Sequence, residues 1–138
     1  MYRKYPNVIY NGITYYSETS KIDRFSIVLS IYFPNQSALL PSDSITLRPA
    51  KIHHFIQHSI DLNNNAYDHT LACVSWLKEH HNKDYYGKPC EIWWKDLYQE
   101  DSFDFIPLQF LSCHCAHTDI KFEDQTVLFV CPINNIKF

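Results

Sequence analysis

The sequence predicts a mostly β fold: a single barrel-like or sandwich-like domain of about eight short strands with little helix. Aromatic residues make up 16% of the chain, with ten Tyr and nine Phe, and such residues favour strands over helices. Polar segments rich in Pro, Asn and Asp separate the apolar runs at short intervals, as turns separate strands. We therefore expect one all-β domain over residues 1–138, and the end at Phe138 is compatible with a piece of a longer protein.

The N-terminal part contains a hairpin signal followed by a long apolar run. Asn11-Gly12 separates NVIY (7–10) from ITYYS (13–17), and Asn-Gly is the strongest short signal for a two-residue hairpin turn. Residues 24–33 are β-branched and aromatic, which predicts a core strand. A loop over 34–44 follows, because that segment holds two prolines and several small polar residues.

Residues 45–62 are the ambiguous element. They continue the strand pattern beyond Pro49, but Ile52, Phe55, Ile56 and Ile60 also match the spacing of one helix face. We prefer a strand, with a helix over 50–60 as the alternative. The strands expected after it are 70–80, 90–98, 105–117 and 126–133, and the polar connections are 63–69, 81–89, 99–104 and 118–125.

Charge and glycine content argue against two classes of function. The net charge is -3, whereas a domain that holds nucleic acid through its phosphates is usually basic on one face. The chain has only two glycines, Gly12 and Gly87, too few for a glycine-rich phosphate loop. The balance is more compatible with a protein or peptide partner.

Cysteine usage and the N-terminus predict a reduced protein in the nucleus or cytoplasm. The five Cys are an odd number without the spacing of a disulfide framework. The first residues lack the apolar run of a signal peptide, and no run of 18 apolar residues occurs, so no membrane association is expected.

The cluster Cys113-His114-Cys115-Ala116-His117 is the most metal-like feature. On a strand, Cys113, Cys115 and His117 project to one face and could bind zinc with a fourth ligand. Candidates for that ligand are Cys73, Cys90, His69 and Cys131. Alternate residues of one strand lie about 7 Å apart, however, so these ligands could share one ion only in bent geometry, and we expect no cofactor. The alternative is a strand with two buried thiols.

Other chemistry-bearing groups lack the surroundings that catalysis requires. His54 and His58 would share a helix face with zinc-protease spacing, but Phe55 stands where that motif has its Glu. No G-x-S-x-G surrounds a serine, and no local signature marks a cysteine nucleophile. We therefore expect no catalytic residues.

The aromatic residues between 76 and 98 form the candidate binding site. Trp93 and Trp94 are adjacent, so on a strand one faces the core and the other is at least half exposed. An exposed Trp beside loop tyrosines can bind a methylated ammonium or a peptide, although such residues also fill β cores. The candidate ligand-binding residues are Trp76, Tyr85, Tyr86, Trp93 and Trp94.

The order of these segments resembles the bromo-adjacent homology (BAH) domain over about residues 45–117. Val74-Ser75-Trp76 stands at the family's Trp strand, Glu91-Ile92-Trp93 at its Glu-led strand, and Pro107 with Leu111 and Cys115 at its last strand. The family's Arg-Pro after the Trp strand is absent, with Leu77-Lys78-Glu79-His80 in its place. The order is also similar to uncharacterised segments in reading frames of invertebrate mobile elements, which implies a transposon-derived origin.

The resemblance implies a non-catalytic β module that binds chromatin proteins in the nucleus. The leading prediction is therefore a module that recognises a peptide, such as a histone tail, or a chromatin protein through the aromatic residues. One alternative is a DNA-binding accessory domain of a mobile element, and another is a small zinc-dependent domain. The basic face of the DNA-binding alternative would comprise Arg3, Lys4, Arg24, Arg48 and Lys51.

Overall fold

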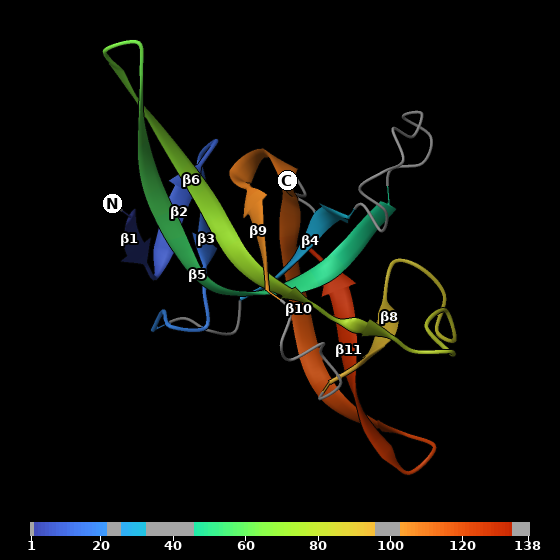
Figure 1. Cartoon of the computed structure of the whole chain (residues 1–138). Coiled ribbons are helices and arrows are strands. Elements are labelled where there is room, and N and C mark those ends of the chain that lie inside the picture. Colours follow the sequence, from blue (N-terminus) through green and yellow to red (C-terminus); the bar gives the residue numbers. More distant parts are fainter. Residues whose placement is uncertain (1, 22–25, 33–45, 96–102, 134–138) are drawn as a thin grey trace.

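The described residues of this computed structural model are 2–21, 26–32, 46–95 and 103–133, and they are almost entirely strand (Figure 1). The predicted mostly β class is confirmed, and the regular helical structure within these ranges is one 3₁₀ turn, Leu108–Phe110. The predicted loop 34–44 lies outside them, as do residues 24, 25 and 33 of the strand expected at 24–33. Residues 96–98 of the strand expected at 90–98 and residues 99–102 of the connection expected at 99–104 also lie outside them. The strands are β1 (Tyr2–Tyr5), β2 (Asn7–Tyr10), β3 (Ile13–Tyr16), β4 (Ile27–Tyr32), β5 (Thr46–Leu62), β6 (Asn65–Trp76), β7 (Lys78–Glu79), β8 (Glu91–Trp94), β9 (Asp104–Pro107), β10 (Leu111–Phe122) and β11 (Gln125–Pro132).

One large antiparallel sheet and one small hairpin make up the fold. The large sheet has the order β7-β8-β11-β10-β4-β5-β6-β9, with β1 added beside β5. The small sheet is the β2–β3 hairpin. The large sheet ends at β7 and β9 and does not close on itself, so the sandwich-like form of the prediction fits and a closed barrel does not.

Three two-residue turns explain why the strands are longer than expected. Asn11 and Gly12 have positive φ angles, as the hairpin signal predicted, and so do Asn63 with Asn64 and Glu123 with Asp124. The segments 63–69 and 118–125, expected as polar connections, are therefore strand except at these turns. The expectation of short strands is wrong here, because β5 has 17 residues and β6 and β10 have 12 each.

The two long hairpins project at opposite ends of the molecule, β5–β6 at the upper left and β10–β11 at the lower right of Figure 1. Residues 61–69, at the end of the β5–β6 hairpin, are all exposed. A strand that projects beyond the core has water on both faces, so it carries polar residues in place of an alternating pattern. That composition made the start of β6 look like a loop.

The ambiguous segment 50–60 is strand, and a β-bulge accounts for its helix-like spacing. The pairing of β5 with β6 shifts register between Ile52 and His54, so His53 is an extra residue. Ile52 and Phe55 consequently both face the core, each fully buried. Two core residues three positions apart are what a helix face also shows, so sequence periodicity could not separate the two structures.

Buried side chains form three clusters on the two faces of the sheet. The largest lies beneath the β2–β3 hairpin and contains Tyr15, Val28, Ile52, Phe55 and Val74 among its ten buried members. The second, on the other face of β4, joins Ile27, Leu77, Trp93, Cys115, Leu128 and Val130. The third comprises Ile92, Phe122 and Val127. The part of the chain that the structure describes has no helix with the length and apolarity of a membrane span.

Candidate functional site

The structure separates the five predicted aromatic residues into three environments. Trp93 is buried, 3% exposed, and belongs to the second core cluster. Trp76 lies at the end of β6, where its indole N–H donates to the Asp104 carboxylate at 2.6 Å and its ring meets Tyr32 edge-on. Neither side chain therefore joins the surface formed by the other three. The opposite orientation of the two adjacent tryptophans is as predicted, since Trp94 is half-buried.

Tyr85, Tyr86 and Trp94 belong to one connected set of rings, which we call the aromatic face. Tyr85 and Tyr86 are 66% and 52% exposed and meet edge to face, with centroids 5.1 Å apart. Phe122 packs under Tyr85 at 4.9 Å, and Phe129 packs under Tyr86 at 5.4 Å. The other members are His80, His81 and Trp94. Phe122 and Phe129 were not among the predicted site residues, because β10 and β11 reach this loop only through tertiary structure. His80 and His81 were not predicted either, although they lie next to the loop in sequence.

Backbone hydrogen bonds fix the loop that carries the tyrosines. Residues 80–87 form successive turns in which Lys83 N–H donates to His80 C=O and Tyr85 N–H to Asn82 C=O. The His80 ring is buried, and its Nδ1 accepts the N–H of Asn82 at 2.9 Å. Ile92 N–H then donates to Lys83 C=O and ties the loop to β8. The two tyrosines therefore stand on a braced loop.

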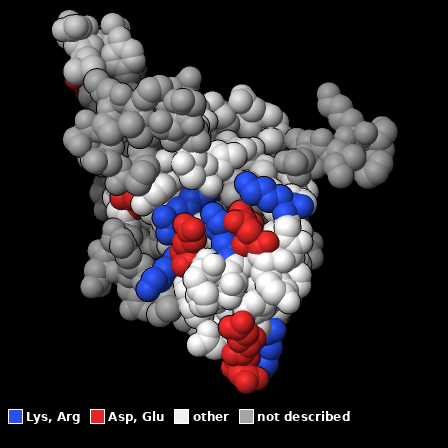
Figure 2. All heavy atoms as spheres, turned by 90° about the vertical axis from the view of Figure 1, so that its right-hand side faces the viewer, with Lys and Arg blue, Asp and Glu red and all other residues white. Residues whose placement is uncertain are grey.

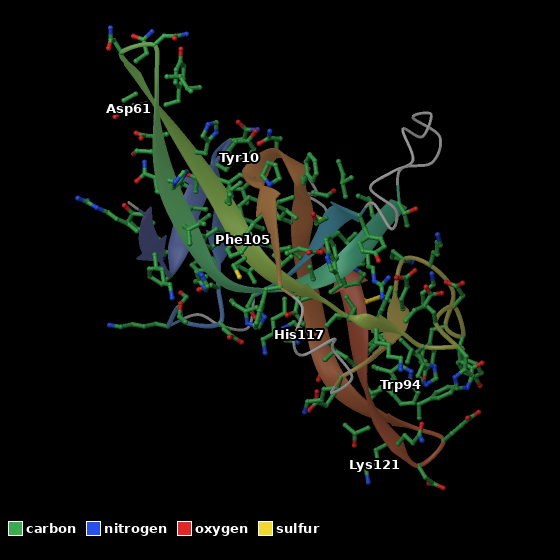
Figure 3. The ribbon with its side chains drawn as sticks, in the orientation of Figure 1. Tyr10, Asp61, Trp94, Phe105, His117 and Lys121 are labelled. Atoms are coloured by element: carbon green, nitrogen blue, oxygen red, sulfur yellow. A yellow bond between two sulfur atoms is a disulfide. The ribbon has the colours of Figure 1, made fainter. Side chains whose placement is uncertain are left out.

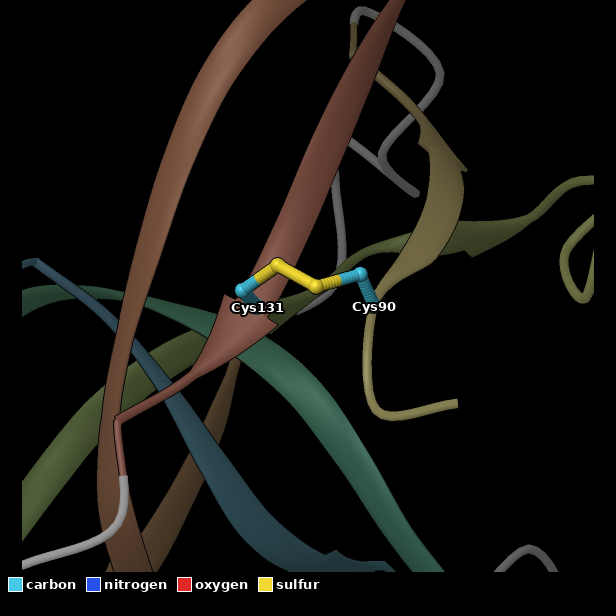
Figure 4. Close-up of a disulfide and its surroundings, with 2 residues drawn as sticks. All are labelled: Cys90 and Cys131. Atoms are coloured by element: carbon cyan, nitrogen blue, oxygen red, sulfur yellow. A yellow bond between two sulfur atoms is a disulfide. The ribbon is translucent and has the colours of Figure 1, made fainter. Parts of the chain in front are cut away.

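A disulfide between Cys90 and Cys131 closes the same loop against β11 (Figure 4). The two Cα atoms lie 4.4 Å apart, next to the pair Glu91 and Val130 in the β8–β11 register. The expectation that all five cysteines are reduced is wrong for these two residues. No local pattern indicates this bridge, because the two cysteines are 41 positions apart and only the pairing of β8 with β11 makes them neighbours.

The two thiols of the predicted zinc cluster are buried or half-buried. Cys115 is fully buried in the second core cluster, and burial raises the pKa of its thiol. Burial also raises the pKa of the half-buried Cys113 thiol. The disulfide engages two of the proposed fourth ligands, Cys90 and Cys131. Within the described ranges, no group of three or more His, Cys, Asp or Glu side chains is arranged to hold a metal ion.

The predicted basic face is divided between different structural roles. Arg3 and Lys4 are exposed on β1, whereas Arg24 lies outside the described residues. Arg48 turns inward, donating to the Leu77 C=O from Nε at 3.0 Å and from an Nη at 2.7 Å. Lys51 lies 3.6 Å from the Glu18 carboxylate. On the side of the molecule shown in Figure 2, charges of both signs lie next to one another.

A second candidate site lies on the outer face of β5 and β6, at the bulge. It is a pocket of about 730 Å³, within the range of small-molecule sites. Figure 3 places Phe105, in its wall, well away from Trp94 of the aromatic face. Its described lining residues are Lys4, Glu18, His53, His54, Ile56, Cys73, Phe103 and Phe105. We call it the histidine pocket.

His53 is held at both ring nitrogens. Its Nδ1 lies 2.7 Å from the Glu18 carboxylate, and its Nε2 lies 2.7 Å from the Ser75 hydroxyl. Burial by itself raises the pKa of Glu18, but the hydrogen bond and charge of His53 and the charge of Lys51 together outweigh it and lower that pKa. Serine, histidine and carboxylate follow one another here in the order of a nucleophilic triad.

The position of Ser75 decides how this chain of hydrogen bonds is interpreted. Its side chain is 3% exposed, and it is not among the residues that line the pocket. This geometry favours an orienting contact from Ser75 to His53 over an exposed nucleophile. No local pattern predicts the arrangement, because Glu18, His53 and Ser75 come from three distant segments.

The chain matches no protein-family model, no curated protein and no solved structure among those with which it was compared. What it does must therefore be argued from its own residues.

Proposed function

We propose that this protein is a non-catalytic binding module that recognises a basic peptide or protein segment through the aromatic face. The observation that carries the proposal is the exposed pair Tyr85 and Tyr86 on a loop held by hydrogen bonds and by the Cys90–Cys131 disulfide. Tyr supplies a large contact area and loses little conformational entropy on binding, and a rigid loop lowers that loss further.

Lys83 of the loop pairs with Glu79 at 3.5 Å, and two other carboxylates near the aromatic face are available to a basic partner. The charge of Glu123 acts on His80, so that carboxylate lies near the rings, and Asp84 directly precedes the tyrosines. Exposed aromatic rings attract lysine and arginine side chains by about 0.5–1 kcal/mol each. The net charge of -3 favours the same partners over bare nucleic acid.

A histone tail is a partner of this chemistry, and the resemblance to the BAH family leads to the same proposal. The transposon-derived origin, the chromatin association and the nuclear or cytoplasmic location remain predictions. The disulfide favours an oxidising compartment, because disulfides are rare in reducing ones. Locating the protein in its native cells would decide between these compartments.

Fluorescence anisotropy with a labelled, lysine-rich histone-tail peptide tests the proposal. Tyr85→Ala/Tyr86→Ala should weaken binding about tenfold or more, which is about 1.4 kcal/mol. The matched control is Tyr67→Ala, since Tyr67 is also exposed but lies on the β5–β6 hairpin. Equal affinities for the parent and the double variant, or no binding at about 1 mM protein, would refute the proposal.

The non-catalytic part has its own test. Because the Ser75 hydroxyl is buried, a fluorophosphonate probe should leave it unlabelled under native conditions. Labelling that mass spectrometry assigns to Ser75, and that His53→Ala abolishes, would show a working nucleophile and contradict the proposal.

A further inference from the structure

The histidine pocket has a fixed wall on one side. His53 is bonded at both ring nitrogens, and its ring also meets Phe103 edge-on, with centroids 4.7 Å apart. Three contacts from separate segments leave the imidazole little freedom to rotate. The β-bulge directs His53 and His54 to the same face of the sheet, which opens this side of the pocket.

The pocket lining also has an apolar, aromatic part. Phe103 and Phe105 are 50% and 53% exposed, on or beside the edge strand β9. Phe105 lies directly across from Cys73 in the β6–β9 register, so its ring stands beside the pocket floor. Exposed phenylalanines that line a concave surface are the usual wall of a site for an aromatic ring.

Lys4 is the lysine in the described lining of the pocket, which also contains the Glu18 carboxylate. Burial is the largest effect on His54 and lowers its pKa, and the Lys4 charge lowers it further, so the ammonium lies near a neutral imidazole. Glu18, the carboxylate in the described lining, is engaged by His53 and Lys51. In the described part of the chain, Lys4 Nζ has no carboxylate within 4.0 Å. An anionic group would find one cation and one neutral N–H donor together here.

We propose that the histidine pocket binds a small aromatic carboxylate, with the carboxylate at Lys4 and His54 and the ring against Phe103 and Phe105. The pocket volume of about 730 Å³ accommodates a ligand of that size. The Glu18–His53–Ser75 hydrogen bonds hold the His53 ring, and Phe103 packs against that ring. This site is separate from the aromatic face and does not depend on peptide binding there.

The test uses phenylacetate and its neutral amide, phenylacetamide, titrated into the ¹⁵N-labelled protein and followed by NMR. Phenylacetate should shift the backbone amides of residues 53–56, 73 and 103–105 in a saturable way. Phenylacetamide should bind about tenfold more weakly, because it lacks the charge that Lys4 recognises.

Two variants complete the experiment. Lys4→Met should weaken phenylacetate binding about tenfold, whereas Lys78→Met, an exposed lysine on β7 at the other end of the sheet order, should leave it unchanged. Phe105→Ala should weaken both ligands, and dispersed spectra will show that each variant is folded. Equal binding of acid and amide, an unaffected Lys4→Met variant, shifts centred elsewhere or no saturation at about 20 mM ligand would overturn the proposal.

Discussion

Removing the Cys90–Cys131 disulfide should destabilise the protein by an amount that depends on the length of the loop it closes. The bridge closes a loop with a sequence separation of 41 residues. In the chain-entropy treatment, closing a loop of that length in the unfolded chain is worth about 4 kcal/mol at 25 °C. Cys90→Ala/Cys131→Ala should therefore lower the free energy of unfolding by up to about 4 kcal/mol, a large part of the stability of a chain this size.

Urea unfolding followed by tryptophan fluorescence measures this loss, because Trp93 is buried beside the bridge in β8. Dithiothreitol should destabilise the parent to a similar extent and leave the double variant unaffected, which makes the variant its own control. A loss below about 1 kcal/mol would refute the loop-closure reasoning. Alkylation of the denatured, unreduced protein should modify three of the five cysteines, and five modified thiols would refute the disulfide itself.

The same perturbation connects stability to the proposed function. Without the bridge, the loop that presents Tyr85 and Tyr86 is held to β8 by hydrogen bonds such as that from Ile92 N–H to Lys83 C=O. A looser loop must be ordered when the peptide binds, so peptide affinity should fall on reduction even where the protein stays folded. Equal affinity of the oxidised and reduced proteins would show that the bridge does not preorganise the tyrosines.

Three further changes test the fold by the same urea titration. Ile52→Val should destabilise by about 1 kcal/mol because Ile52 is fully buried, whereas Ile9→Val, at a side chain 74% exposed, should have little effect; equal losses would contradict the core assignment. Glu123→Asn with Asp124→Gly should stabilise by about 1 kcal/mol, because both positions have positive φ; a loss would exclude this turn. Burial lowers the pKa of His80 from 6.5 in the folded chain, so the unfolded chain binds the proton more readily. The free energy of unfolding should therefore fall as the pH drops below 6.5, and His80→Asn should reduce that pH dependence. An unchanged pH dependence would exclude a buried neutral imidazole.

Local patterns predicted well those features that depend on neighbouring residues. The Asn11-Gly12 turn was predicted correctly, because it needs positive φ angles at two adjacent residues and Asn and Gly adopt them readily. The opposite orientation of Trp93 and Trp94 followed from the two-residue period of a strand. The start of β6 was missed, because the exposed end of the β5–β6 hairpin has no apolar face to reveal its period. The end of β10 was missed as well, although it carries the half-buried Ile120 and the buried Phe122.

The candidate sites depended much more on the fold. Sequence proximity grouped Trp76 and Trp93 with the tyrosines, but strand pairing buries Trp93 and carries Trp76 to Tyr32 and Asp104. Phe122 lies 37 residues after Tyr85, which it supports, and Phe129 lies 43 residues after Tyr86. No local pattern encodes such contacts, because they arise from the antiparallel register.

The sequence by itself therefore determined the β class, the first hairpin turn and the side on which adjacent aromatic residues lie. These depend on backbone preference and on the side-chain period of a strand, both local properties. The tertiary structure alone decided which cysteines pair, which aromatic rings share a surface, and that Glu18, His53 and Ser75 meet beside a pocket. Each of these is a contact between segments far apart in the chain, and only the complete set of strand pairings brings such segments together.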